Sequence, residues 1–337
     1  MTGGGLRVDE LEVVRDGFRL GPVSVAVEPG TATALIGPSG AGKTTLLRAV
    51  AGFLPIRRGT ISFDGHRIES TPPERRQFGW VPPGLGLFER RSVRQNVGYP
   101  LWIRGDDDWR VRTEPWLERF GLAAVADRRP YRLSSGERQR VAMARALAAG
   151  PKLLLWDEPL GALDVESVAA LSAVLREVLE QERLPLLLVT HDPRTAASLA
   201  REWVILDRGL CRGSAPPGSW IDRARDRFTA RFVGHRNVFG REELEAARDS
   251  RWGPVLLERA GDGGVLVPSH AIDWSLTAGS PHATVAAIRP QGDQWDIEIR
   301  DGRLSFTVGP VAGSDAPPIG ASVRFDIRLD RVRGLEA

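Results

Sequence analysis

The 337-residue sequence lacks the features expected of a secreted or membrane-spanning protein. A single cysteine, Cys211, excludes an internal disulfide framework, as expected in a reducing compartment. No apolar run is long enough to span a bilayer, and residues 1–10 lack the charged-then-apolar order of a signal peptide. The net charge is only +3 and no basic, aromatic-rich face is evident, so no nucleic-acid partner is expected. These absences predict a cytoplasmic chain.

The first two thirds of the chain alternate short apolar runs with helical patterns. Such alternation predicts an α/β sheet of buried parallel strands. The expected strands are at Thr31–Ile36, Leu153–Trp156, Leu186–Val189 and Trp203–Leu206, and a helix is expected at Val168–Glu180. From about residue 84 to residue 150, the alternation is interrupted by patterns typical of helices. We therefore predict a helical subdomain there, within a domain spanning 1–233.

The sequence pattern changes at Asn237. From there, short apolar runs alternate with Gly, Asp and Pro turns, a pattern typical of an all-β domain. The runs read GPVLLER, GGVLVP, ATVAAIR, WDIEIR, LSFTV and SVRFDIRL. We therefore expect a second, all-β domain at 237–337, which the length of the chain readily allows.

The most informative motif, GPSGAGKTT, lies between the expected strand Thr31–Ile36 and a run with a helical pattern. Its glycines let consecutive backbone N–H groups face a phosphate, Lys43 reaches the β- and γ-phosphates, and the Thr44 hydroxyl coordinates Mg²⁺. A purely structural glycine turn would not also need Lys-Thr at this register. We expect the whole P-loop to bind the phosphates of a nucleoside triphosphate through Gly37, Pro38, Ser39, Gly40, Ala41, Gly42, Lys43, Thr44 and Thr45.

Two carboxylates end the apolar run LLLWDE at residues 153–158. Taken alone, this pair would be read as a solvated strand end. Beside a P-loop, we expect Asp157 to hold Mg²⁺ through a water and Glu158 to polarise the attacking water as general base.

A third motif, LSSGERQR, precedes a helical run that Gly150-Pro151 ends. Ser134 and Glu137, three residues apart, form a capping-box pattern. The segment resembles the LSGGQ signature of ATP-binding cassette (ABC) ATPases. The resemblance implies a homodimer in which the signature of one subunit, here Ser134, Ser135, Gly136 and Glu137, completes the ATP site of the other.

The remaining motifs of that family follow in order, and the resemblance covers about residues 6–232. GALD at 161–164 resembles the D-loop, which gives Asp164 a role at the dimer contact. His191, after an apolar strand, resembles the switch histidine that contacts the γ-phosphate.

The chain departs from the family pattern at two positions, and a third is ambiguous. Pro83 occupies the register of the Q-loop glutamine, and neither Gln77 nor Gln95 is in that register, so slow hydrolysis or another Mg²⁺ ligand is expected. Ser135 replaces a signature glycine. Phe18 is the nearest candidate for stacking on adenine, with a core position as the equal alternative.

The resemblance implies an ATP-hydrolysing subunit of an ABC importer, peripheral on the cytoplasmic face of the membrane. The all-β domain resembles the OB-like (TOBE-type) domain of importer ATPases. A separate permease would dock through its coupling helix, for which Phe88–Val97 is the candidate contact, and an extracytoplasmic binding protein would deliver the cargo. A molybdate-type oxyanion or ferric iron is the expected cargo. The alternative is a slow nucleotide switch whose β-barrel binds an effector.

Overall fold

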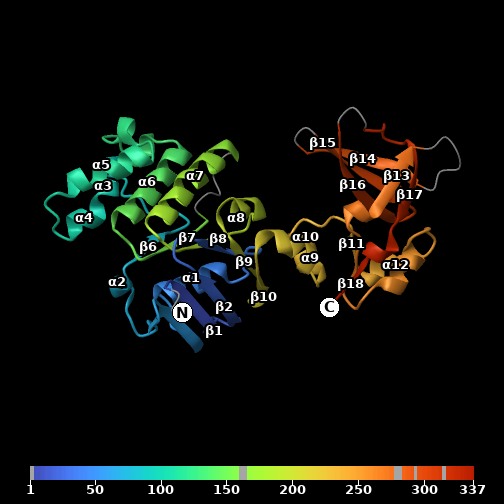
Figure 1. Cartoon of the computed structure of the whole chain (residues 1–337), viewed down its shortest axis with the longest axis horizontal. Helices are drawn as coiled ribbons and strands as arrows, with labels where there is room; N and C mark the ends of the chain where they lie inside the picture. The colour runs from blue at the N-terminus through green and yellow to red at the C-terminus, as the bar shows by residue number, and fades with distance from the viewer. Residues whose placement is uncertain (1–3, 159–164, 277–282, 292–293, 313–315) are drawn as a thin grey trace. The chain divides into compact units, whose positions relative to one another are not determined.

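The computed structural model describes residues 4–158, 165–276, 283–291, 294–312 and 316–337. The chain divides into two compact units, Met1–Pro217 and Gly218–Ala337 (Figure 1). In these residues, no helix is both long and apolar enough to cross a membrane. The predicted α/β fold with an appended antiparallel β domain is confirmed.

A six-stranded sheet forms the centre of the first unit, in the order β10-β9-β3-β8-β7-β6. Five strands run parallel, and β10 pairs antiparallel with β9 at the edge. Every residue of β3, β7 and β8 is buried, which explains their uninterrupted apolar runs. The strands are β3 Ala32–Ile36, β6 Phe78–Val81, β7 Leu153–Asp157, β8 Leu186–Thr190, β9 Glu202–Asp207 and β10 Leu210–Ala215.

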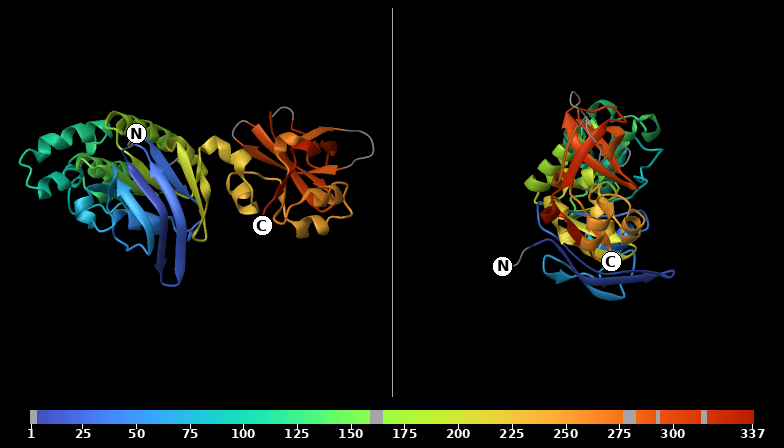
Figure 2. Two further views of the ribbon diagram at one scale, coloured as in Figure 1. Left: turned by 60° about the horizontal axis from the view of Figure 1, so that its bottom comes forward. Right: turned by 90° about the vertical axis from the view of Figure 1, so that its right-hand side faces the viewer.

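A second, antiparallel sheet of the same unit has the order β2-β1-β4-β5. Its strands are β1 Leu6–Arg15, β2 Phe18–Val27, β4 Arg58–Phe63 and β5 His66–Arg67. Figure 2 shows β1 and β2 as a long hairpin near the N-terminus. Helix α1, Lys43–Ala51, contributes Leu46, Leu47 and Val50 to one hydrophobic core with strands of both sheets. Helix α1 is therefore fixed between the two sheets, and so is the loop from which it starts.

A group of helices forms the predicted helical subdomain, on the side of the unit away from β1 and β2 (Figure 1). Its members are α3 Val93–Val97, α4 Tyr99–Ile103, α5 Trp109–Arg119 and α6 Ser135–Ala148, with 3-10 turns at Ala123–Val125 and Pro130–Arg132. The predicted capping box is present, because Ser134 caps α6 and exchanges hydrogen bonds with Glu137. The unit also contains α2 Pro73–Arg76, α7 Val165–Gln181 and α8 Pro193–Leu199.

The second unit contains two antiparallel sheets, of order β11-β12-β18 and β13-β17-β14-β15-β16. Their strands are β11 Val238–Phe239, β12 Gly264–Leu266, β13 Ile272–Leu276, β14 Ala283–Gln291, β15 Gln294–Asp301, β16 Leu304–Ala312, β17 Ser322–Ile327 and β18 Arg333–Leu335. Among its described residues, four short helices accompany them: α9 Trp220–Arg223, α10 Arg227–Phe232, α11 Arg241–Glu245 and α12 Gly253–Arg259. The same residues include 3-10 turns at Ser269–Ala271 and Leu329–Arg331, and another, Pro217–Ser219, lies at the boundary between the two units.

One predicted strand of this unit is wrong. The run GPVLLER forms helix α12, with Pro254 in its first turn and Leu256 fully buried in the core. A short apolar run does not distinguish a strand from a buried helix, and proline in the first turn favours the helix. The remaining five runs contain strands.

The boundary between the units lies before the one expected from the sequence. Helices α9 and α10, placed by prediction in the domain 1–233, belong to the second unit. The backbone explains this assignment, because Glu336 N–H donates to the Arg225 carbonyl at 2.7 Å and Asp226 forms a parallel bridge with Glu336. The C-terminal strand thus attaches these helices to the β domain.

A buried amide in the second unit generates a stability prediction. Asn237 is 1% exposed, donates from Nδ2 to the Thr307 carbonyl at 2.8 Å and accepts from the Thr307 N–H at 2.6 Å. We expect Asn237→Ala to destabilise the unit by about 1–3 kcal/mol, the cost of leaving buried polar groups without partners. Denaturant-dependent hydrogen exchange of β16 in the full chain measures this change.

Ser269→Ala is the matched control, because Ser269 also donates to the Thr307 carbonyl but at 3.3 Å, and its loss leaves both Asn237 bonds intact. Equal effects of the two substitutions would contradict the role given to Asn237.

Candidate nucleotide-binding site

The predicted P-loop joins β3 to α1 in a conformation that depends on glycine. Gly37 has φ 153°, and a Cβ there would lie 2.1 Å from the Leu206 carbonyl oxygen. Gly42, with φ 102°, is the N-cap of α1, and a Cβ there would lie 2.8 Å from Leu20. Neither position accepts a side chain without displacement of its neighbours. The loop therefore wraps closely around the start of α1, with backbone N–H groups of the first helical turn free of intrahelical partners.

Lys43 folds back on this loop. Its Nζ donates to the carbonyls of Gly37 and Pro38 at 2.8 and 2.9 Å. Burial lowers the pKa of Lys43, whereas the charges of Glu158 and Asp157 act in the opposite direction. An ammonium group carries three donors, so the third is available to an anion beside the loop.

The P-loop and the acidic strand end meet at Thr44. Its hydroxyl donates to Asp157 Oδ1 at 3.0 Å, although the two residues are 113 positions apart. Asp157 is 1% exposed, and burial raises its pKa, against the effect of the Thr44 hydrogen bond. Among the described residues, its Oδ2 has no hydrogen-bond partner. A buried carboxylate oxygen without a partner beside a hydroxyl provides hard oxygen donors, which fit Mg²⁺.

Glu158 and His191 form a second contact at the same edge of the sheet. His191 Nδ1 lies 3.1 Å from Glu158 Oε1, and their side chains are 56% and 37% exposed. Glu158 has φ 54°, an uncommon conformation for a residue with a side chain, and its N–H donates to the Val189 carbonyl at 2.9 Å. The chain thus turns directly after β7, and this turn brings the Glu158 carboxylate to His191, the residue that follows β8. Strain of this kind is concentrated at functional sites.

The P-loop, Asp157 and Glu158 line one pocket of about 600 Å³, whereas His191 is not part of its described lining. Its walls come from the β1–β2 hairpin, the P-loop, the segment after β6 and the end of β7. The lining residues are Arg15, Asp16, Phe18, Ser39, Gly40, Ala41, Gly42, Lys43, Thr44, Thr45, Pro83, Asp157 and Glu158. Pro83, the residue assigned to the Q-loop register, is one of these lining residues.

Sequence reasoning missed part of this wall. Arg15 and Asp16 line the pocket and form an ion pair at 3.0 Å, yet no motif marks them. The only available signal was their place beside the hairpin turn that carries Phe18. Phe18 itself is half-buried against the hydrophobic core, with its ring edge next to Gly42, and it also lines the pocket.

The two glutamines near the Q-loop register, Gln77 and Gln95, are not among the described residues that line the pocket. The Gln95 side chain accepts from the Ser92 N–H at 2.9 Å and completes the capping box of α3. Gln77 is the C-cap residue of α2, with φ 58°. Asp164, assigned to the D-loop, lies outside the described residues.

The signature residues lie at the start of α6, and the described lining of the pocket includes none of them. Ser134 and Ser135 are exposed. The Ser134 N–H donates to the Glu137 carboxylate at 2.7 Å and lowers its pKa, and the Glu137 N–H donates to the Ser134 hydroxyl at 3.2 Å, which completes the capping box. This helix end presents backbone N–H groups and a hydroxyl to solvent, which are suitable donors for an anion on another molecule.

Comparisons with known proteins agree with this geometry. Residues 20–161 match the ABC transporter family. The chain is 38% identical over 326 residues to the Fe(3+) ions import ATP-binding protein FbpC of Streptomyces avermitilis, covering 93% of this chain and 94% of that one. It is 33% identical to the sulfate/thiosulfate import ATP-binding protein CysA of Mycobacterium bovis, covering 94% and 95% of the two chains.

A third relative matches over a smaller part of its own length. The spermidine/putrescine import ATP-binding protein PotA of Frankia alni is 35% identical over 284 residues, which is 83% of this chain and 61% of PotA. Among solved structures, CbiO1 of Clostridium perfringens, part of an ABC transporter complex, has a TM-score of 0.60 at 28% identity and covers 65% of this chain. The chain therefore belongs to the ATP-binding subunits of ABC transporters, a family of ATP-hydrolysing transport ATPases.

Proposed function

We propose that this protein is the ATP-hydrolysing subunit of an ABC importer and that two copies close around two ATP molecules. The observation that carries the proposal is the 3.0 Å contact of Thr44 with Asp157, which joins the P-loop to the acidic strand end inside one pocket. A phosphate-binding loop, a metal-binding pair and a candidate base then surround the same space. This is the set that ATP hydrolysis requires.

The residues of the pocket divide the work. The P-loop N–H groups and the third donor of Lys43 bind the phosphates. Thr44 and Asp157 would hold Mg²⁺, Asp157 through a water, and the bound ion would neutralise charge on the phosphates. Glu158 accepts the proton of the attacking water, and His191, 3.1 Å away, holds that carboxylate and contacts the γ-phosphate.

The second half of each site would come from the partner subunit. Ser134 and Ser135 are exposed, the Gly136 N–H lies in the first turn of α6, and these residues do not line the described pocket of their own chain. Their donors, together with Glu137, suit the γ-phosphate that the other copy holds. Asp164 would lie at the contact between the two sites.

The membrane partners follow from the family. We assign the protein to the cytoplasmic face of the membrane, where Phe88–Val97 would receive the coupling helix of a permease supplied with cargo by an extracytoplasmic binding protein. Phe88 is 37% exposed and its ring lies 4.3 Å from that of Tyr99, which supports an apolar contact there. The second unit, with its antiparallel sheets, would act as a regulatory TOBE-like domain.

For the cargo, we propose an inorganic ion, either ferric iron or a tetrahedral oxyanion of the sulfate or molybdate type. The support is that the ferric-ion and sulfate relatives match over 94% and 95% of their lengths, against 61% for the polyamine relative. Uptake of radiolabelled iron, sulfate, molybdate and spermidine by cells lacking this protein tests the assignment. Selective loss of spermidine uptake would refute it.

Replacing the candidate base tests the chemistry. Glu158→Gln should keep ATP affinity while lowering turnover by about 10²- to 10⁴-fold, the usual contribution of a general base. Steady-state ATPase assays and nucleotide titrations measure the two quantities. Glu182→Gln, an exposed acid remote in sequence, is the control. Turnover of Glu158→Gln within a few-fold of the parent would remove Glu158 from this role.

The split site makes a separate prediction. Ser134→Arg should leave ATP binding to the monomer nearly intact and abolish ATP-driven dimerisation, measured by size-exclusion chromatography in the Glu158→Gln background. Ser92→Arg is the matched control, because Ser92 caps α3 with the same capping box, and either change costs about 1 kcal/mol of helix capping. Dimerisation that survives Ser134→Arg would make the signature helix purely structural.

The proline at position 83 leads to a prediction about Mg²⁺ dependence. Proline offers no side-chain ligand and fixes φ, so the pocket has one potential metal ligand fewer at this edge. Pro83→Gln should raise basal ATPase activity and lower the Mg²⁺ concentration needed for half-maximal rate. Pro82→Gln, one residue before the pocket wall, is the control. An unchanged Mg²⁺ titration for Pro83→Gln would show that the substitution has no functional effect.

A further inference from the structure

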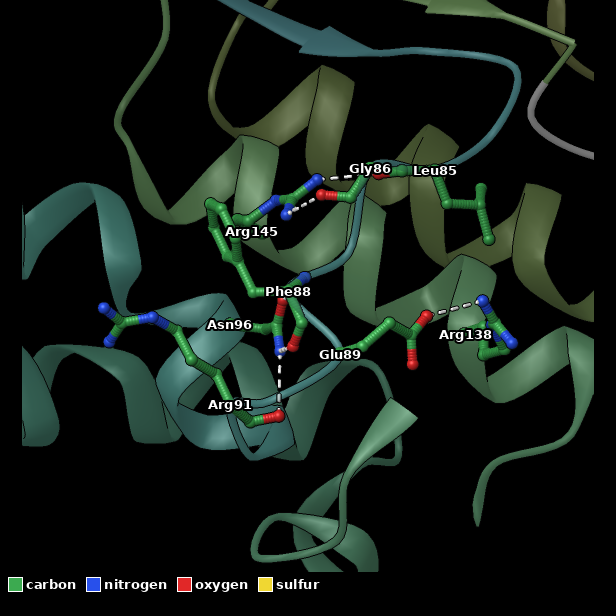
Figure 3. A network of polar contacts seen from close by, with 8 residues as sticks. All are labelled: Leu85, Gly86, Phe88, Glu89, Arg91, Asn96, Arg138 and Arg145. Carbon is green, nitrogen blue, oxygen red and sulfur yellow. Dashed lines mark hydrogen bonds and ion pairs between the residues drawn. The ribbon is translucent and has the colours of Figure 1, made fainter. Parts of the chain in front are cut away.

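An arginine of the signature helix binds the segment that leads away from the pocket. Arg145, in the last turn of α6, donates from Nη1 to the Gly86 carbonyl and from Nη2 to the Leu85 carbonyl, both at 2.7 Å (Figure 3). The planar guanidinium fork thus binds two consecutive carbonyls, a bidentate geometry that lysine cannot reproduce.

The backbone at these carbonyls is unusual. Leu85 and Gly86 both have left-handed φ values, 62° and 59°. A leucine seldom adopts this conformation, and it persists only where neighbouring contacts hold it. Leu85 also ends a tight turn, in which its N–H donates to the Pro82 carbonyl at 2.9 Å. Pro83, inside this turn, lines the nucleotide pocket, so only one residue, Gly84, separates the pocket wall from the carbonyls that Arg145 binds.

The contacts of Arg145 with this segment compensate for its burial. Burial lowers the pKa of Arg145, and among the described residues no carboxylate forms an ion pair with it. Its remaining contact is the ring of Phe88, whose centroid lies 5.4 Å from Cζ. The two carbonyls and the ring therefore replace the water that the guanidinium loses. Any movement of the segment away from α6 would leave this cation without its described partners.

Two further contacts fix the same segment, as Figure 3 shows. Arg138, the residue directly after the signature on α6, forms an ion pair with Glu89 at 3.0 Å. Asn96 on α3 is fully buried, accepts from the Phe88 N–H at 2.8 Å and donates to the Phe88 carbonyl at 3.1 Å. The segment from Leu85 to Arg91 is thus bound from two helices of the helical subdomain.

We infer that Arg145 is a positioning residue that fixes the signature helix to the Pro83 edge of the nucleotide pocket, so that the two move as one body. The inference rests on the proposed function, in which the signature of one copy closes on the ATP of the other. Arg145 contacts neither nucleotide in this scheme. It sets the orientation of α6, and a dimer with two composite sites needs both α6 helices oriented correctly at once.

The test compares three variants of the full chain in the Glu158→Gln background. Arg145→Gln removes the fork, Arg145→Lys keeps the charge, and Arg104→Gln is the matched control. Arg104 also joins α6 to another segment, through a 2.7 Å hydrogen bond to the Ala149 carbonyl, but it leaves Leu85 and Gly86 untouched. Fluorescent ATP titration measures monomer binding, and sedimentation velocity with ATP measures dimerisation.

We expect Arg145→Gln to bind ATP within about twofold of the parent and to weaken dimerisation by about tenfold or more, the scale of a lost charge-assisted hydrogen bond. Arg145→Lys should fall between Arg145→Gln and the parent. Arg104→Gln should match the parent in both assays. Parent-like dimerisation of Arg145→Gln, or an equal loss in Arg104→Gln, would overturn the inference. If Arg145→Gln does not fold, Arg145→Lys decides by the same criterion.

A second measurement reads orientation without catalysis. Spin labels on Val111→Cys in α5 and Arg67→Cys in β5, both exposed positions, report the distance between the helical subdomain and the antiparallel sheet in a Cys211→Ser background. Arg145→Gln should broaden the distance distribution, and Arg104→Gln should leave it narrow. An unchanged distribution would also overturn the inference. Failure of the parent itself to dimerise with ATP would instead refute the proposed function.

Discussion

The hydrogen bond between Thr44 and Asp157 is the contact on which the rest of the site depends. It brings together residues 113 positions apart, and it is possible only because β3 and β7 are buried parallel strands whose carboxyl ends lie at one edge of the sheet. The contact has an electrostatic cost. Burial raises the pKa of Asp157 in the folded chain, so ionisation of this carboxylate opposes folding as the pH rises through that pKa. A cation bound beside Oδ2 would offset this cost and would link the stability of the site to its ligand.

The second constraint is the attachment of the helical subdomain. Between β6 and α3 the chain contains two consecutive prolines, a tight turn and two left-handed residues, and it forms no regular element there. Such a segment would be free to move if it depended on its own backbone. Here Arg145, Arg138 and Asn96 supply the missing contacts from α6 and α3. The prolines reduce the conformations of the turn, and the side chains select one of them.

The sequence predicted those parts of the molecule that local patterns determine. The buried strands, the P-loop and the capping box of α6 follow from runs of residue types at fixed spacing, and they lie where they were expected. Helix α12 was predicted wrongly because seven residues show too little periodicity. Arg145 was not found, because α6 contains several arginines and only the fold decides which one meets two carbonyls. Arg15 was missed because no motif marks it, and only the fold brings it to the pocket.

The nucleotide-binding site does not determine which cargo is transported. Relatives with a polyamine, a ferric ion and a sulfate as cargo share 33–38% identity with this chain, and one nucleotide-binding unit serves all three. In the proposed importer, the cassette would not contact its cargo, so it could differ between importers only in how fast it cycles and how it transmits movement. Under the proposed function, both properties would involve the residues from Pro83 to Arg91, because Pro83 lines the nucleotide pocket and the ring of Phe88 is exposed. Variation in this segment, more than in the P-loop, is therefore the physical means by which one importer ATPase would be adapted to its own permease.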